Sequence, residues 1–286
     1  MKDLKLIACQ QSVDFGFELS GARFHSPGEL NANTEKAAAL RARKGGRAIA
    51  CLTAYDYPMA RLLDEAGADL LLVGDSLGMV VLGFPDTTHV TLGHMIHHTA
   101  AVARAKPQAL VVGDLPIGTY PDAATALIHA RRLVDAGAEA VKLEGGVRQA
   151  DKVRAIVADG IPVLGHLGML PQRVLEEGGY HRKGRTPEQV EALHEGARAL
   201  AAAGVFGVVL ESVVGEVARE ITAALEIPTI GIGCGEGNCD GEIAVVTDVV
   251  GSFPWFVPPF ATPLADVAGL TREAARQWVG RVMEGS

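Results

Sequence analysis

Polar side chains that can bind a metal ion or move a proton recur at the ends of short apolar segments of this chain. They are Asp56, Asp75, Ser76, Asp114, Lys142, Glu144, His166 and Glu211. Burying several carboxylates together is unfavourable unless a cation compensates their charge. Mg²⁺ is the simplest such cation, since it takes a few carboxylates together with water and substrate oxygens. The pattern therefore predicts a magnesium-dependent site that also contains a lysine and a histidine.

Each of these residues also has a structural explanation. An Asp or Ser directly after a strand commonly caps the next helix, and we expect Asp56, which precedes Tyr57 and Pro58, to be such a cap. Lys142 would pair with Glu144 if both face the same side of a strand, and a lone histidine is more often structural. The catalytic interpretation depends on the joint occurrence of these residues at successive strand ends, which helix capping does not require.

The segments that precede these residues are apolar almost throughout, which is typical of parallel strands covered on both faces. Seven are clear, at 48–56, 68–76, 109–116, 138–146, 161–168, 204–212 and 227–235. Segments of helical spacing lie between them, and Thr186 followed by Pro187 is expected to begin one that ends near Gly204. The stretch 240–251 fits either an eighth strand-helix unit or a helix capped by Asp240.

This alternation of strands and helices predicts a (β/α)₈ TIM barrel, in which the C-terminal strand ends converge on the active-site face. A doubly wound open sheet is the alternative, because periodicity alone does not separate the two. We expect residues 1–46 to form an N-terminal extension that is partly disordered or packed on a neighbour. Residues 47–286 are expected to form a single barrel domain with a C-terminal helical segment.

The composition excludes several other classes of protein. The 286 residues include 34 Asp and Glu against 26 Lys and Arg, a net charge of −8 that is unlike a nucleic-acid or anionic-membrane binder. Four cysteines are too few for a disulfide scaffold, and no apolar run is long enough for a membrane span. We expect a reduced, cytoplasmic protein. A basic loop at 181–185 is expected to contact an anionic substrate or a neighbouring subunit, or else to be solvated.

Several motifs occur together between residues 47 and 251. They are TAYDYPMA (53–60), VGDSLGM (73–79), HHTAAV (97–102), GDLPIGTY (113–120), VKLEGG (141–146), IPVLGHLGMLPQ (161–172), VLES (209–212) and IPTIGIGCG (227–235). In content and order they resemble the motifs of the ketopantoate hydroxymethyltransferase (3-methyl-2-oxobutanoate hydroxymethyltransferase) family. The chain departs from the family pattern at Val214, Cys234, Glu242 and Pro258-Pro259, which leaves the metal and base positions intact.

The resemblance implies a (β/α)₈ barrel of the phosphoenolpyruvate/isocitrate lyase type, Mg²⁺ dependence and 5,10-methylenetetrahydrofolate as cosubstrate. The implied reaction transfers a hydroxymethyl group to 3-methyl-2-oxobutanoate through a Mg-stabilised enolate. Its product is 2-dehydropantoate (ketopantoate), used in pantothenate and coenzyme A biosynthesis. The family also implies self-association as a homodecamer. The alternatives are a metal-dependent 2-oxoacid lyase or mutase of the same superfamily, or a non-catalytic barrel scaffold.

The resemblance also assigns roles residue by residue. The expected metal ligands are Asp75, Asp114 and Glu144. The expected substrate-binding residues are Asp75, Ser76, Asp114, Lys142 and His166. Glu211 of the VLES motif is the expected catalytic base.

Overall fold

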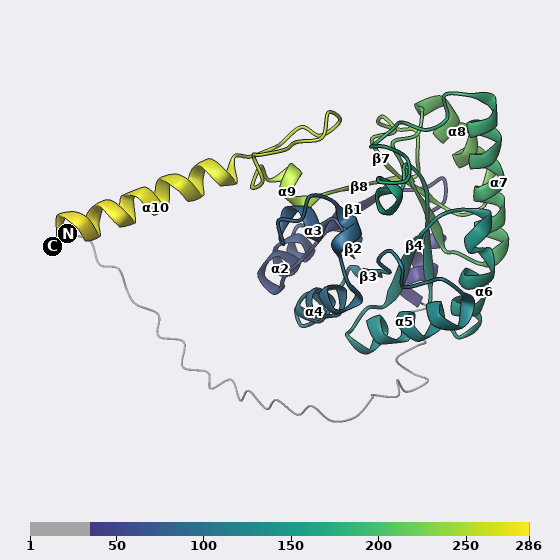
Figure 1. Cartoon of the computed structure of the whole chain (residues 1–286), viewed down its shortest axis with the longest axis horizontal. Coiled ribbons are helices and arrows are strands. Elements are labelled where there is room, and N and C mark those ends of the chain that lie inside the picture. Colours follow the sequence, from purple (N-terminus) through teal and green to yellow (C-terminus); the bar gives the residue numbers. More distant parts are fainter. Residues whose placement is uncertain (1–34, 286) are drawn as a thin grey trace.

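Eight parallel strands close into a barrel in the computed structural model, which describes residues 35–285 (Figure 1). The strands are β1 (Ile49–Thr53), β2 (Leu70–Val73), β3 (Leu110–Asp114), β4 (Ala140–Glu144), β5 (Val163–Gly168), β6 (Gly207–Glu211), β7 (Thr229–Ile232) and β8 (Gly241–Ala244). Each strand pairs with its neighbour in chain order, and β8 pairs with β1. The barrel predicted from the sequence is confirmed, and the open sheet is excluded.

Helices lie between the strands and after the last one. They are α2 (Tyr57–Glu65), α3 (Leu77–Val80), α4 (Leu92–Ala103), α5 (Ala123–Asp135), α6 (Ala150–Ala158), α7 (Pro187–Ala203), α8 (Gly215–Ala224), α9 (Val246–Val249) and α10 (Val267–Glu284), with short 3₁₀ turns at Thr87–His89, Val147–Gln149 and Pro171–Arg173. The Asp56 side chain accepts a hydrogen bond from the Met59 amide and caps α2, as predicted. Thr186 caps α7 in the same way, and Gly204 ends that helix with φ +98°.

The stretch 240–251 contains the eighth strand-helix unit, because β8 is followed by α9. Asp240 does not cap a helix. Its carboxylate accepts the Thr229 amide at 2.8 Å and pairs with Lys44 at 2.9 Å. Gly241 makes the barrel closure possible, since a Cβ there would lie 2.3 Å from the carbonyl oxygen of Ile49 on β1.

Strand residues alternate between the barrel interior and the helix layer. The interior is filled by an apolar cluster that includes Ile49, Cys51, Leu70, Leu72, Leu110, Val112, Ala140, Leu164, Phe206, Val209, Ile230 and Ile243. Because the side-chain period of a strand is two, residues two positions further along face the same way. At the C-terminal strand ends those residues are Asp114, Lys142, His166 and Glu211. The alternation that packs the core therefore also directs the polar side chains inward.

Residues 35–46 close the opposite end of the barrel. Ala37 and Leu40 are buried against the interior cluster, and Lys36 pairs with Glu139 at 2.8 Å. This part of the predicted N-terminal extension packs on the chain's own barrel. Residues 1–34 lie outside the described residues, so the expectation for them stays a prediction.

The C-terminal helix α10 projects away from the barrel (Figure 1). No residue of α10 is buried, and its exposed apolar side chains include Leu270, Trp278, Val279, Val282 and Met283. Exposed apolar surface of this kind is typical of interaction sites. Among the described helices, including this long one, none has the length and apolar character that crossing a membrane requires.

Candidate active site

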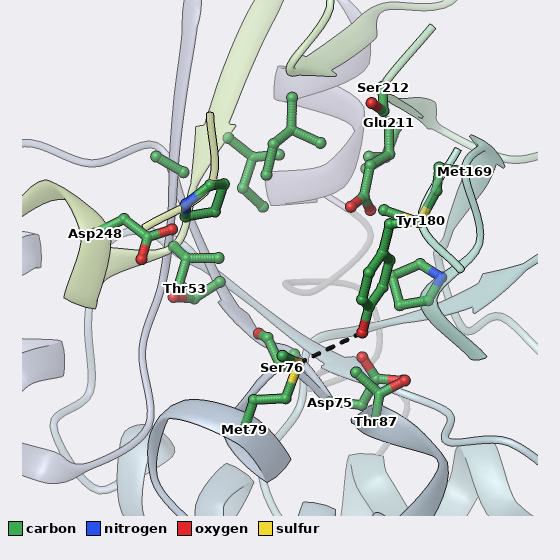
Figure 2. Close-up of a pocket in the computed structure, with 18 of the residues that line it drawn as sticks. Thr53, Asp75, Ser76, Met79, Thr87, Met169, Tyr180, Glu211, Ser212 and Asp248 are labelled. Atoms are coloured by element: carbon green, nitrogen blue, oxygen red, sulfur yellow. Dashed lines mark hydrogen bonds between the residues drawn. The ribbon is translucent and has the colours of Figure 1, made fainter. Parts of the chain in front are cut away.

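A cavity of about 620 Å³ opens at the C-terminal ends of the strands; we call it the barrel cavity (Figure 2). Its lining includes every site residue predicted from the sequence, namely Asp75, Ser76, Asp114, Lys142, Glu144, His166 and Glu211. Except for Ser76 and Glu211, these residues are buried. The barrel therefore brings together side chains that are spread over 137 positions of the chain, from Asp75 to Glu211.

Strand register sets which of these side chains are neighbours. Asp114 on β3 lies beside Lys142 on β4, and Glu144 on β4 lies beside His166 on β5. Gly168 ends β5 beside Glu211 with φ +99°, and a Cβ there would lie 2.1 Å from the Glu211 carbonyl oxygen. Only glycine therefore allows β5 to end this close to the backbone of Glu211.

The backbone just after Glu211 is strained. Ser212 has φ +51°, a left-handed conformation that is uncommon for a residue with a side chain. Its amide donates a hydrogen bond of 2.7 Å to Ile232 on β7, which holds this turn in place. Such strain is concentrated at functional sites. It supports a functional role for the adjacent Glu211.

Lys142 forms the closest ion pair in the cavity. Its Nζ lies 2.5 Å from Oδ2 of Asp114 and 3.9 Å from Oε1 of Glu144, so the nearer partner is on the neighbouring strand. Burial alone would lower the pKa of Lys142, but the charges of Asp114, Glu144 and Asp75 raise it above its ordinary value. Lys142 therefore remains an ammonium ion and suits a site that stabilises negative charge.

His166 lies between two carboxylates. Its Nδ1 is 3.4 Å from Oε1 of Glu144, and its Nε2 is 3.1 Å from Oε2 of Glu211. Burial and the charge of Lys142 lower the pKa of His166, yet the two carboxylates outweigh them and raise it to about 9. At neutral pH the ring is therefore a cation that holds the Glu211 carboxylate in position.

Gln172 links two of the acidic residues and was not assigned from the sequence. Its Nε2 donates to Asp75 at 2.8 Å, its backbone amide donates to Glu144 at 3.2 Å, and the Tyr120 hydroxyl donates to its Oε1. Burial, together with the charges of Asp114 and Glu144, raises the pKa of Asp75 well above its ordinary value. The available signal for Gln172 was its place at the end of the IPVLGHLGMLPQ motif.

The charges of the cavity fit a divalent cation. Four carboxyl groups (Asp75, Asp114, Glu144 and Glu211) face two cations, so full ionisation of the four would leave two negative charges for a metal ion to compensate. Oδ1 of Asp114 is buried without a hydrogen-bond partner, and Oε1 of Glu144 makes no hydrogen bond, only the longer ion-pair contacts to His166 and Lys142. Mg²⁺ needs only one or two protein carboxylates, because water and substrate oxygens complete its octahedron. Asp75 and Asp114 can provide them.

Glu144 has more protein partners than the other two predicted ligands, since it contacts His166, Lys142 and Gln172. Within residues 35–285, no three or more His, Cys, Asp and Glu side chains form a ready metal cluster. A role for Glu144 as the third ligand therefore stays a prediction.

Other residues of the wall were not predicted as site residues. Tyr180 reaches over the cavity and donates to Sδ of Met79 at 3.7 Å (Figure 2). Asp248 lines the cavity, as do Pro258 and Pro259, where the chain departs from the family pattern. The basic loop also contributes Arg182 and Arg185 to the wall, so its position favours contact with an anionic ligand.

Several solved structures are similar to this barrel. A putative phosphonomutase from Burkholderia cenocepacia has a TM-score of 0.60 at 19% identity, over 89% of this chain and 100% of that one. A 2,3-dimethylmalate lyase, described as a PEP mutase/isocitrate lyase superfamily member, has a TM-score of 0.54 at 18% identity, over 90% and 88% of the two chains. These likenesses show the fold, a closed (β/α)₈ barrel with its cavity at the C-terminal strand ends.

Sequence comparison specifies the family within this fold. The profile of the ketopantoate hydroxymethyltransferase family matches residues 34–286. The 3-methyl-2-oxobutanoate hydroxymethyltransferase of Ignicoccus hospitalis is 51% identical over 86% of this chain and 93% of its own. The Dehalococcoides mccartyi protein of that name is 51% identical over 83% of this chain and 84% of its own. The chain belongs to the ketopantoate hydroxymethyltransferase family.

Proposed function

We propose that this enzyme transfers a hydroxymethyl group from 5,10-methylenetetrahydrofolate to 3-methyl-2-oxobutanoate in a Mg²⁺-dependent reaction that yields 2-dehydropantoate. The chain is a member of the ketopantoate hydroxymethyltransferase family, and one observation on its structure supports this proposal. Glu211, paired with His166, shares a cavity with Asp75, Asp114 and Glu144, and these four carboxyl groups outnumber the two cations of the cavity by two. A base beside a site for a divalent cation is what enolisation of a 2-oxoacid requires.

The roles of the residues follow from their positions. Lys142 and Ser76 bind the oxygens of the oxoacid, and Lys142 stabilises negative charge as it develops on the keto oxygen. Glu211 accepts the C3 proton while His166 holds its carboxylate in place. Mg²⁺, which Asp75 and Asp114 would hold with Glu144 as the expected third ligand, supplies Lewis-acid polarisation of the keto group when bound.

The second half of the reaction forms a carbon–carbon bond. The C3 carbanion equivalent attacks the methylene carbon of the folate, and a carbon–nitrogen bond to the folate breaks. Water supplies the hydroxyl oxygen of the product as the second carbon–nitrogen bond of the methylene bridge breaks. The C3 proton and one proton of the water go to the two folate nitrogens, and tetrahydrofolate leaves.

The test is direct. Purified protein is incubated with Mg²⁺, 3-methyl-2-oxobutanoate and 5,10-methylenetetrahydrofolate, and 2-dehydropantoate is measured by mass spectrometry. We expect product formation that depends on all three additions and stops when EDTA removes the metal. Folded protein that forms no product above background would refute the proposed function.

We further propose that the chain self-associates, with the homodecamer as the expected assembly. Support comes from the exposed apolar side chains of α10, among them Trp278 and Val279. Sedimentation velocity is expected to give a mass several times that of the 29.9 kDa chain. Removal of residues 265–286 is expected to lower that mass, and an unchanged mass would show that α10 is not the contact. The cytoplasmic location stays a prediction.

A further inference from the structure

The volume of the barrel cavity exceeds what 3-methyl-2-oxobutanoate, the smaller of the two proposed substrates, requires. A five-carbon oxoacid beside Asp75, Lys142 and Glu211 fills only part of about 620 Å³. Cavities of roughly 300–1,000 Å³ hold drug-sized ligands. The rest of the cavity therefore has room for a second, larger ligand.

One acidic residue faces that remaining space. Asp248 on α9 is 7% exposed, and its side chain points into the cavity from the wall opposite Glu211 and Tyr180 (Figure 2). Within residues 35–285, no hydrogen bond or ion pair is found for its carboxylate. Burial alone raises the pKa of Asp248, to about 6.

The nearby polar groups are already engaged. The Thr53 hydroxyl accepts the amide of Val246 at 2.9 Å, and the Tyr55 hydroxyl is 2.9 Å from that of Ser76. A buried carboxylate without partners destabilises the fold, and residues of this kind are kept where a ligand supplies the partner. Asp248 therefore lacks the hydrogen-bond donors that a ligand in the cavity would bring.

The surroundings of Asp248 indicate the kind of ligand. The cavity wall includes the aromatic rings of Phe253, Phe256 and Phe260, which suit a flat ring system. A carboxylate accepts two parallel hydrogen bonds from adjacent N–H donors on such a ring. Arg182 and Arg185, also in the wall, suit carboxylates on the same ligand. A reduced pteridine with a benzoyl-glutamate tail has all three features.

We propose that Asp248 binds the one-carbon donor by accepting hydrogen bonds from the ring N–H and the amino group of its aminopyrimidinone edge. This inference rests on the proposed function, because that function introduces a folate cosubstrate. Asp248 is then a binding residue for the folate and takes no part in enolisation of the oxoacid, which occurs on the opposite side of the cavity.

The test compares Asp248→Asn, Asp248→Ala and wild type by isothermal titration with tetrahydrofolate, in the presence of Mg²⁺ and 3-methyl-2-oxobutanoate. We expect Asp248→Asn to raise the Kd by about 10- to 100-fold, the loss expected for charge-assisted hydrogen bonds, and Asp248→Ala to raise it at least as much. Exchange of the C3 deuterium without folate is expected to stay within about twofold of wild type. The melting temperature of Asp248→Asn is expected to equal or exceed that of wild type.

Glu236→Gln is the matched control, because it removes one exposed negative charge from the β7–β8 loop without touching the cavity. Its Kd is expected to match wild type. The proposal is overturned if either Asp248 variant binds tetrahydrofolate within twofold of wild type, or if wild type does not bind it. A raised Kd that is accompanied by a lower melting temperature and slower C3 exchange would also overturn it, since Asp248 would then be structural. Failure of the proposed function has a separate signature: wild type forms no 2-dehydropantoate, whatever the Asp248 variants bind.

Discussion

Replacement of Glu211 by Gln is expected to lower C3 deuterium exchange and 2-dehydropantoate formation together, by about 10²–10⁴-fold, the usual loss of a general base. Glutamine keeps the shape of the side chain but cannot accept the proton. Asp75, Asp114 and Lys142 remain in place, so the affinity for 3-methyl-2-oxobutanoate should change little. Exchange is followed by proton NMR in deuterated water without folate, which isolates enolisation from the later folate step.

Glu216→Gln is the matched control for this experiment, since Glu216 lies in the exposed first turn of α8, five residues after Glu211. Both rates should equal those of wild type. If Glu211→Gln exchanges deuterium at the wild-type rate while product formation collapses, Glu211 acts at the folate step and its assignment as the base is wrong.

Replacement of Asp75 by Asn is expected to reduce Mg²⁺-dependent turnover by at least about 10²-fold, because loss of metal polarisation removes several kcal/mol of transition-state stabilisation. The metal-free protein should nevertheless become more stable. Burial and two neighbouring carboxylates raise the pKa of Asp75, so its ionised form disfavours the folded state. That destabilisation is absent below the unfolded-chain pKa near 4 and grows as the pH rises toward the folded-state value. The gain from Asp75→Asn should therefore be larger at pH 7 than at pH 4.5.

Asp114→Asn provides the contrast. Burial and Glu144 raise the pKa of Asp114 too, but this carboxylate lies 2.5 Å from the buried ammonium of Lys142, which opposes that rise. Removing one partner of a buried ion pair typically costs about 3–5 kcal/mol, reduced here because Glu144 stays 3.9 Å from Lys142. Both variants should lose metal-dependent activity, but only Asp114→Asn should lose stability. Thermal melts with EDTA and with Mg²⁺ separate the two cases. Destabilised, metal-free Asp75→Asn would instead assign a structural role to Asp75.

Much of this architecture was determined locally and could be predicted from the sequence. Apolar runs covered on both faces specify parallel strands, and their period of two places Asp114, Lys142, His166 and Glu211 on the inner face. Helix signals are equally local. Asp56 and Thr186 cap their helices through contacts three residues away, which is why both could be assigned from the sequence.

Only the closed barrel determined which polar and charged side chains of the cavity lie next to one another. Lys142 and Glu144 share one side of β4, so the sequence suggested that they pair, but the register between β3 and β4 places Asp114 nearer to Lys142. Gln172 reaches Asp75 across 97 positions, and Asp248 enters the cavity because β8 pairs with β1. Local periodicity determines which way a side chain faces along its own strand. The distances between strands, and so the partner of each charge, depend on long-range packing that no short stretch of sequence encodes.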